Sequence, residues 1–413
     1  MRHPTLSQLE GIVQTHLPGH SQTTVTGFTQ LKNIGYSYTR SIRTYILDLA
    51  PAGSAKSTCC CFLTIDVSPS SNSDSNSLPT IHNLFKLLHD ASSSLPFPIP
   101  IPILDTTLTT LPFPFILTPP PPTSSGTYTS ENITTLAHAR RTVLNANTKA
   151  DTLLDLQIGA LLGRAHALVQ NDFFGPVTIT PEANAATTSS IPEPTEPGQT
   201  YSWQETFTHL LESLLSAFEL ASESESESES ALDIPYTQIR AHLSRAIGFF
   251  LFDDADTPSL VWFSGFEEDI LLLTSRAALD SDAEMNVSIA AILPSMFTHA
   301  LWADPLLESF FLPSPNRPSQ ALNEAYLSSG GKHLLLFPRQ RTKRIWYSLF
   351  LGLVVLREWC FGAAQGSVKR GTEDEGGDED KNEESENENE TIKQWALKLV
   401  LESTKALESA PCY

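Results

Sequence analysis

Residues 41–67 read SIRTYILDLAPAGSAKSTCCCFLTIDV, which is two apolar runs separated by a polar turn. Apolar and polar side chains alternate in the first run (41–50), and the second run (59–67) is almost continuously apolar. Both patterns are typical of β-strands, and the turn at 51–58 is short enough to join them as an antiparallel pair. The N-terminal part of the chain is therefore predicted to be built around a strand hairpin.

The turn of this hairpin ends in Lys-Ser, as a phosphate-binding loop does. A P-loop needs one Gly directly before the Lys and another Gly five residues earlier, because its backbone must approach the phosphates closely. Ala55 and Ala50 occupy these two places. The turn is therefore interpreted as a plain connection between strands.

The cysteines and the apolar runs indicate a cytoplasmic protein without a membrane span. Cys59, Cys60 and Cys61 are adjacent, and neighbouring side chains of a strand point to opposite faces, so they are poor disulfide partners for one another. Residues 1–20 lack the apolar core of a signal peptide. Residues 345–356, the most apolar run, are too few to cross a bilayer and predict a core helix. We expect reduced thiols in a reducing compartment.

The formal net charge of −21 is concentrated in two runs. Residues 222–229 (SESESESE) and 371–391 carry −14 of it, and no basic face remains, so nucleic acid is not an expected partner. Neither run contains an apolar side chain. We therefore expect a disordered insertion near 222–230 and a disordered acidic tract at 371–391. These runs serve either as solubilising insertions or as a phosphorylatable switch or binding tail.

Beyond residue 145 the apolar spacing changes from that of strands to that of helices. Helices are predicted at 152–170, 202–221, 235–252, 339–359 and 391–404. The predicted fold class is α+β with two lobes, and the domain boundaries are an N-lobe at 1–122, a helical C-lobe at 123–370, the acidic tract at 371–391 and a C-terminal helix at 392–413. Two lobes of this kind are also the plan of kinases.

Several phrases make the comparison with kinases more specific. LGRAHALVQNDFFGP (162–176), PYTQIRAHLSRAIGFFLF (235–252), HALWADPLLE (299–308) and RQRTKRIWYSLFL (339–351) together resemble the fungal aminoglycoside-phosphotransferase-like (protein-kinase-like) family. The resemblance implies a kinase-like fold and transfer of phosphate from ATP, with magnesium, to a small-molecule hydroxyl or amine. It also implies a context in fungal natural-product pathways.

The groups that hold the nucleotide in such a family are absent at the matching positions. The phosphate-holding Lys belongs in the strand ending FLTIDVSP, where Asp66 stands. The Glu that positions this Lys belongs near Ile81, and its neighbours His82 and Asn83 are not acidic either. An anion at residue 66 would repel the phosphates that the Lys attracts.

The catalytic groups are also replaced. By this resemblance, Ser264 stands where the catalytic base belongs, Asp269 where the metal-binding Asn belongs, and Met296 where the metal-binding Asp belongs. A Ser is no base at neutral pH without help, and a thioether holds magnesium poorly. The chain is thus interpreted as a degenerate member that uses no cofactor. The alternative is a divergent phosphotransferase that uses ATP and magnesium.

The stretch TPSLVWFSGFEEDILL (257–272) contains the candidate catalytic residues. Ser264, Glu267, Glu268 and Asp269 could act as proton donors or acceptors, and no residues are assigned to a metal. The alternative is a solvated turn after a buried strand, since clustered acids are mostly surface features.

Aromatic and apolar residues surround this turn in the sequence and suit an apolar small molecule better than a triphosphate. The predicted substrate-binding residues are Trp262, Phe263, Phe266, Met296 and Phe297. Their function would be to bind an intermediate of secondary-metabolite biosynthesis, for example for a cyclisation. The alternative is that these residues fill the space that ATP has vacated, in a pseudokinase with a binding role.

Other polar residues have structural interpretations. His166 on an apolar helix is expected to be a hydrogen-bonded core residue, and Asp304 resembles an Asp that fixes a loop. The bases between 339 and 344 either bind an anionic ligand or cap and solubilise a helix start.

Overall fold

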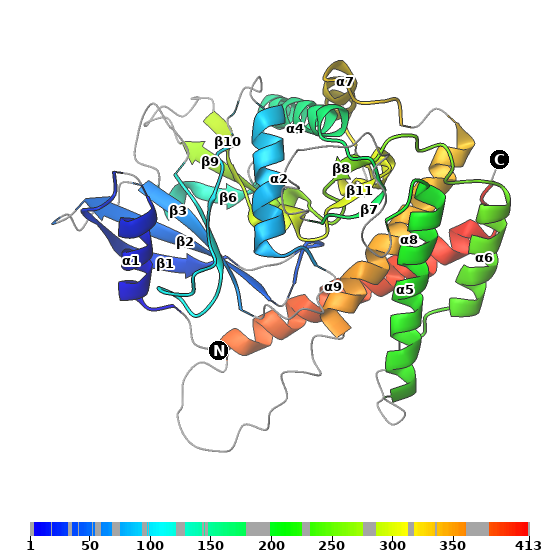
Figure 1. Cartoon of the computed structure of the whole chain (residues 1–413), viewed down its shortest axis with the longest axis horizontal. Coiled ribbons are helices and arrows are strands. Elements are labelled where there is room, and N and C mark those ends of the chain that lie inside the picture. Colours follow the sequence, from blue (N-terminus) through cyan, green and yellow to red (C-terminus); the bar gives the residue numbers. More distant parts are fainter. Residues whose placement is uncertain are drawn as a thin grey trace, which may run out of the picture.

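The computed structural model describes residues 4–17, 19–31, 35–39, 41–51, 53, 59–67, 75–92, 97, 99–120, 129–142, 144, 148–178, 199–224, 232–275, 286–312, 318–334, 337–360 and 380–411. A five-stranded antiparallel sheet lies at one end of the molecule and helices make up most of the other end (Figure 1). None of the described helices combines the length and the apolar character that a membrane span requires.

The N-lobe sheet confirms the predicted hairpin. Its strands are β1 (Thr23–Gln30), β2 (Ile42–Pro51), β3 (Cys59–Asp66), β4 (Ile103–Asp105) and β5 (Phe115–Thr118), in the order β1-β2-β3-β5-β4. β2 and β3 pair antiparallel from Leu49 opposite Cys59 to Ile42 opposite Asp66. β4 takes the edge of the sheet, where the prolines that precede it interrupt no central ladder.

Both faces of this sheet are covered, which explains why β3 reads as a continuous apolar run. Helix α1 (Leu6–His16) packs against the face that contains Cys61 and Leu63. The opposite face, with Cys60, packs against the β9–β10 hairpin of the second sheet. Helix α2 (Leu78–Ala91) covers the rest of that face (Figure 1). The three adjacent cysteines are free thiols, as expected.

Two small sheets lie between the N-lobe and the helices. One consists of β6 (Ile133–Thr135), β9 (Ile270–Ser275) and β10 (Asn286–Ile292), and the other of β7 (Gly175–Pro176), β8 (Ser259–Val261) and β11 (Leu301–Ala303). Short 3-10 turns join them: η1 (Ser130–Asn132), η3 (Glu267–Asp269), η4 (Pro294–Phe297), η5 (Pro305–Leu307) and η6 (Ser309–Phe311). The stretch that follows β8 is therefore held between two sheets.

Most of the described C-lobe helices occur where helical spacing was found, but two of them, at 136–142 and 320–328, were not predicted. The described helices of this lobe are α3 (Leu136–Thr142), α4 (Thr148–Leu168), α5 (Trp203–Ser224), α6 (Tyr236–Gly248), α7 (Gln320–Ser328), α8 (Pro338–Cys360) and α9 (Asp380–Leu407). Glycines allow two of the helix pairs to approach closely. A Cβ on Gly159 of α4 would lie 2.2 Å from the Leu322 carbonyl oxygen of α7, and one on Gly352 of α8 would lie 2.9 Å from Val400 of α9. Larger residues at these glycines would force both pairs apart.

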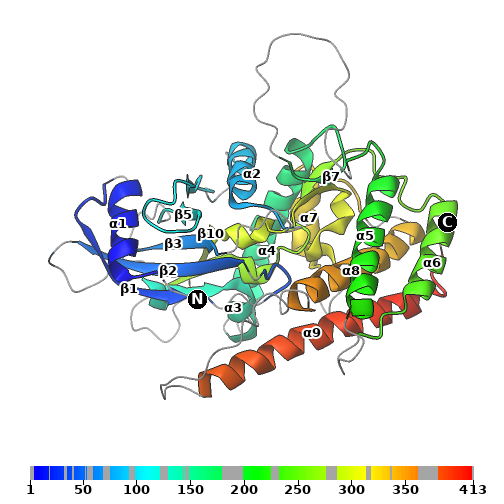
Figure 2. The same ribbon diagram turned by 60° about the horizontal axis from the view of Figure 1, so that its bottom comes forward.

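Helix α9 differs from the expectation for the acidic tract. Residues 380–391, predicted to be disordered, form its first turns, and the helix ends at Leu407 rather than at 413 (Figure 2). The physical reason is propagation: Ala396 and Val400 pack α9 against α8, and each further residue then adds one hydrogen bond without a new nucleation cost. Residues 371–379 and 225–231 lie outside the described residues, so the rest of the two disorder predictions stays a prediction.

Candidate functional site

The turn between β8 and β9 has an unusual backbone at its start. Phe263 has a φ of 59°, in the left-handed region that aromatic residues rarely enter. This conformation costs about 1 kcal/mol or more, and such strain persists only where the surroundings enforce it. Phe263 is fully buried and stacks on Phe350 of α8, with ring centroids 5.0 Å apart. The packing of the helical lobe thus fixes the geometry of the turn.

Asp269, at the end of this turn, is buried with its hydrogen bonds already made. Oδ1 accepts from the Ser37 hydroxyl at 2.7 Å and from the Ser295 hydroxyl at 2.5 Å, and Oδ2 accepts from the Phe266 backbone N–H at 3.0 Å. Burial raises the pKa of the Asp269 carboxyl above its ordinary value, although these hydrogen bonds oppose the shift. Asp269 therefore has the environment of a structural carboxyl.

The segment between β1 and β2 closes over the turn. Tyr36 stacks between two rings, with centroids 5.3 Å from Phe266 and 4.4 Å from Trp395 of α9. Tyr38 stacks on Trp359 at the end of α8, at 4.0 Å. The protein's own side chains therefore occupy the space next to Asp269.

Glu267 belongs to an ion-pair network. Its carboxylate contacts the Arg140 guanidinium of α3, which also contacts Asp155 and lies 2.7 Å from Asp151. One Arg thus binds three acids, two of them from α4. Glu267 is buried, and this network gives it a structural role rather than that of a proton donor.

The carboxyl group of Glu268, in the same turn, has a shifted pKa. Burial, more than the neighbouring Asp269 and Glu267 charges, raises its pKa to about 7. Its Oε2 atom is buried without a hydrogen-bond partner in the described structure. Gly35, at a φ of 141°, covers it so closely that a Cβ there would lie 3.3 Å from the Glu268 side chain. A covered acid of this kind can exchange a proton but has little room for a substrate.

Ser264 lies in a chain of polar groups that runs to α8. Its hydroxyl is 2.7 Å from His299 Nδ1, and His299 Nε2 is 3.6 Å from the Glu358 carboxylate. Burial acts to raise the pKa of Glu358, but His299 and Arg357 outweigh it, and the pKa lies below its ordinary value. Ser264 and His299 can share a proton, whereas the contact of His299 with Glu358 is an ion-pair contact without a hydrogen bond.

His299 also lines a cavity of about 440 Å³, which we call the His299 cavity. Apolar side chains from α5 and α8 form one wall, among them Leu210, Leu214 and Phe350, together with Phe263 of the turn. The opposite wall is the N-terminal end of α2, with Ser75, Asn76, Ser77 and Thr80. The cavity is mostly apolar, with a few polar groups, and its volume suits a small molecule.

The chain matches no protein-family model and no curated protein. Among solved structures, a candidate aminoglycoside phosphotransferase from Ralstonia eutropha JMP134 matches it with a TM-score of 0.50 at 11% identity, covering 99% of this chain and 100% of that one. Spectinomycin phosphotransferase in complex with ADP and spectinomycin matches with a TM-score of 0.47 at 10% identity, over 97% of this chain and 99% of that one.

The fold is kinase-like. The first of these matches spans nearly the whole of both chains, and it confirms the predicted α+β class with two lobes. At this identity the likeness shows the fold alone, so every statement about chemistry has to come from the residues of this chain.

ATP and magnesium do not fit the residues at the matching place in this kinase-like fold. Strand β3 contains no Lys or Arg, and Ile81 of α2 is fully buried in the core. Asp269, which the resemblance places at a metal-binding position, is bonded by three donors of the protein itself. In the described part of the chain, no three His, Cys, Asp or Glu side chains are placed to hold a metal ion.

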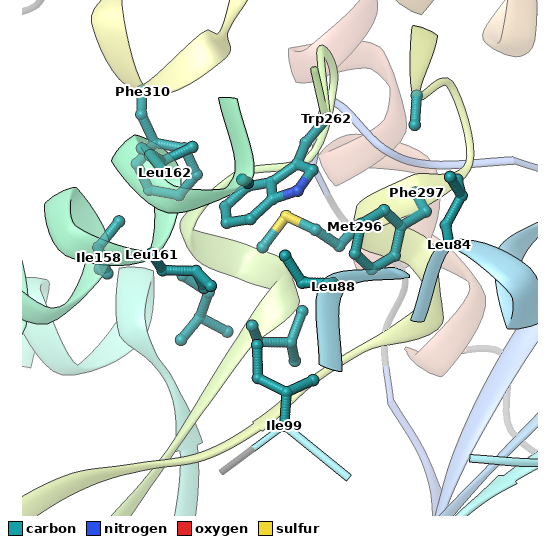
Figure 3. Packing of buried hydrophobic residues seen from close by; sticks show 14 of the residues in the cluster. Leu84, Leu88, Ile99, Ile158, Leu161, Leu162, Trp262, Met296, Phe297 and Phe310 are labelled. Carbon is teal, nitrogen blue, oxygen red and sulfur yellow. The ribbon is translucent and has the colours of Figure 1, made fainter. Parts of the chain in front are cut away.

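Ser295 and Met296 are adjacent, and their surroundings differ. Ser295, and not Met296, bonds to Asp269, while Met296 is fully buried in the core. Figure 3 draws Met296 with Trp262 and Phe297 in this hydrophobic cluster. These three predicted substrate-binding residues therefore serve as packing in the described structure. Phe263 and Phe266 each line a cavity, but two different ones.

The remaining sequence interpretations concern polar core residues. His166 Nδ1 lies 3.1 Å from the Tyr326 hydroxyl, which agrees with a hydrogen-bonded core histidine. Asp304 caps η5 through the Leu306 N–H at 3.0 Å and accepts from the Tyr347 hydroxyl at 2.8 Å, so it fixes its loop as expected.

His299 and Glu358 were not predicted from the sequence as site residues. They are 35 and 94 residues from Ser264 along the chain, and no local pattern connects positions so far apart. The only available signal was their chemistry, because a His and a Glu inside apolar segments need buried partners.

Proposed function

We propose that this kinase-fold protein does not transfer phosphate and instead binds a small, mainly apolar molecule in the His299 cavity. The resemblance to the fungal family supplies the context, secondary-metabolite biosynthesis in the cytoplasm, and the step would be a cyclisation or isomerisation without cofactor. The observation that carries the proposal is the set of three hydrogen bonds that Asp269 accepts from Ser37, Ser295 and Phe266.

Those hydrogen bonds argue against phosphoryl transfer. A kinase-type site needs a carboxylate or amide free to bind magnesium and a basic group for the phosphates. Here the carboxylate is bonded internally, and Asp66 stands at the end of β3. Since the groups of a phosphoryl-transfer site act as a unit, the loss of several leaves little activity.

The His299 cavity offers a different chemistry. Its apolar wall can hold a flexible substrate in a reactive conformation, which by itself lowers the entropic part of the barrier. His299 lines the cavity, but its Nδ1 contacts the Ser264 hydroxyl and its Nε2 is buried beside Glu358, so Nδ1 would have to release Ser264 before it could accept a proton from the substrate. Glu358 would stabilise the imidazolium formed in between.

A divergent phosphotransferase is the second candidate function, and one observation favours it. Glu268, with its pKa near 7, is an acid that could accept the proton of an acceptor hydroxyl. Direct titration with ATP and magnesium, together with an ATPase assay, separates the two functions. We expect neither binding nor turnover. Micromolar ATP affinity with turnover that Glu268→Ala abolishes would overturn the proposal.

The role of the cavity is tested in the producing organism. Leu210→Trp fills the cavity from α5, and Leu220→Trp places the same ring on an exposed position of the same helix. Deletion of the gene, Leu210→Trp and His299→Gln should each make one unprocessed intermediate accumulate, whereas Leu220→Trp should not. An unchanged metabolite profile after the deletion would mean that the protein binds a molecule without catalysing its conversion.

A further inference from the structure

A second cavity, of about 500 Å³, is lined by residues of α8 and α9; we call it the Arg344 cavity. Its lining combines one buried Arg with hydroxyls and rings. Ser309 and Ser348 contribute the hydroxyls, and Tyr36, Phe266 and Trp395 contribute the rings. The size is that of a small-molecule site.

Arg344 is buried without a partner at this cavity. Arg344 is 4% exposed, and its Nε and Nη1 atoms are buried without a hydrogen-bond acceptor. Among the described residues no carboxylate pairs with it. Glu402, the acid that lines the cavity, is exposed and lies 3.8 Å from Lys398 instead. The guanidinium is therefore uncompensated.

An uncompensated buried guanidinium is costly and calls for an explanation. Burial lowers the pKa of Arg344 only to about 9, so the group keeps its charge at neutral pH. Its planar set of donors matches the geometry of a carboxylate or a phosphate, which it can bind through two parallel hydrogen bonds. The aromatic rings beside it suit a flat apolar body rather than a bare ion.

We propose that the Arg344 cavity binds an organic anion, a carboxylate or phosphate carried on an aromatic or apolar body. Arg344 would bind the anion through its guanidinium, since the Ser348 and Ser309 hydroxyls already donate to the Arg344 and Gly265 carbonyls. The body would lie against the Trp395 and Phe266 rings. This site is distinct from the His299 cavity, and the proposal does not depend on the reaction proposed there.

Calorimetric titration of the full chain tests the proposal with four probes at pH 7: 2-naphthoate, 1-naphthyl phosphate, inorganic phosphate and the neutral 2-naphthamide. The two naphthyl anions should bind, 2-naphthamide should bind at least about tenfold more weakly than 2-naphthoate, and inorganic phosphate should bind more weakly than naphthyl phosphate. The tighter of the two naphthyl anions identifies the natural headgroup as carboxylate or phosphate.

Two variants and a control make the test specific. Arg344→Met should weaken binding of the better anion by about ten- to a hundredfold, and Arg344→Lys should weaken it less, because it keeps the charge but loses the paired donors. Lys405→Met removes a positive charge from the exposed side of α9 and should change the affinity by less than about twofold. Absence of binding of both naphthyl anions to the wild type would overturn the proposal. So would equal affinities of wild type and Arg344→Met, or an Arg344→Met chain that fails to fold.

Discussion

Lys343 and Arg344 are adjacent on α8, both are at least 96% buried, and their surroundings are opposite. Lys343 Nζ lies 2.5 Å from the Asp254 carboxylate and also contacts Asp304. These two acids outweigh the effect of burial and raise the pKa of Lys343. Arg344 has a cavity in place of a partner, and burial lowers its pKa.

This difference separates a structural charge from one that is available for binding. The partners of Lys343 come from the loops before β8 and after β11, so the ion pairs fix those loops against α8. Arg344 joins no two parts of the described chain. Burial alone therefore does not indicate function, whereas burial together with a missing partner and an adjacent cavity does.

The largest expected effect compares these two positions directly. Lys343→Met should lower the free energy of unfolding by about 4 kcal/mol, because it leaves Asp254 and Asp304 without their cation. Arg344→Met should leave it unchanged or raise it by up to about 1 kcal/mol, since it removes an uncompensated charge. Urea unfolding at pH 7 measures both. Similar losses for the two variants would mean that Arg344 has a partner in the chain.

Asp269→Ala should cost about 3 kcal/mol of unfolding free energy, since it leaves two hydroxyls and one N–H buried without an acceptor. Asp269→Asn should cost less, because the amide oxygen can still accept. The matched control is the exposed Asp253→Ala, which should stay within about 0.5 kcal/mol of the wild type. If Asp269→Ala lowered the free energy of unfolding by less than about 1 kcal/mol, this carboxylate would be available for binding or catalysis.

Glu268 should give the fold a pH dependence that Glu268→Gln removes. Its pKa is about 7 in the folded state against 4.5 in the unfolded chain, so the folded state holds the extra proton between these values. The stabilisation is complete below pH 4.5 and is lost as the pH rises through 7. Between pH 5 and pH 8 the free energy of unfolding of the wild type should therefore fall by about 2 kcal/mol more than that of Glu268→Gln. This value allows for the partial exposure of the side chain.

Urea unfolding of both proteins at the two pH values measures this difference. Glu131→Gln replaces an exposed acid, so its free energy of unfolding should equal that of the wild type at both pH values. A gap between wild type and Glu268→Gln that does not widen with pH would mean that the Glu268 carboxyl is solvated.

The smallest effect is expected from removing residues 372–390. The core contacts that the structure describes for α9 come from residues after 391, including Trp395, Ala396 and Val400, so the shortened chain should keep them. We expect a melting temperature within a few degrees of the full chain and unchanged binding at both cavities. Loss of folded protein on this deletion would show that the acidic run contacts the core.

Much of the fold could be predicted from the sequence because it depends on short-range patterns. The alternation in residues 41–50 and the helical spacing beyond residue 145 each reflect which side chains face a core. The first turns of α9 were missed because residues 380–391 have no apolar pattern of their own. They are helical because the packed part of α9 extends into them.

The candidate site could be predicted only in part, because it depends on long-range contacts. That Asp66 and Ser264 stand where a kinase would carry a Lys and an Asp is implied by the resemblance and stays a prediction. The sequence did not show that Ser37 reaches Asp269 across 232 positions, nor that Ser264 meets His299. Nor did it show that Ser295 donates to Asp269, since the register of the 3-10 turn decides which side chain of that turn faces Asp269.

The stack of Tyr36 between Phe266 and Trp395 has a consequence for the order in which the protein can be completed. Trp395 lies 359 positions after Tyr36 in the chain, so it leaves the ribosome later than Tyr36 and its strands. Until α9 arrives, one face of the Tyr36 ring has no partner, and one wall of the Arg344 cavity is missing. The N-lobe strands can therefore form before α9 is made, but the segment that closes over Asp269 can reach its final position only after α9 has been synthesised.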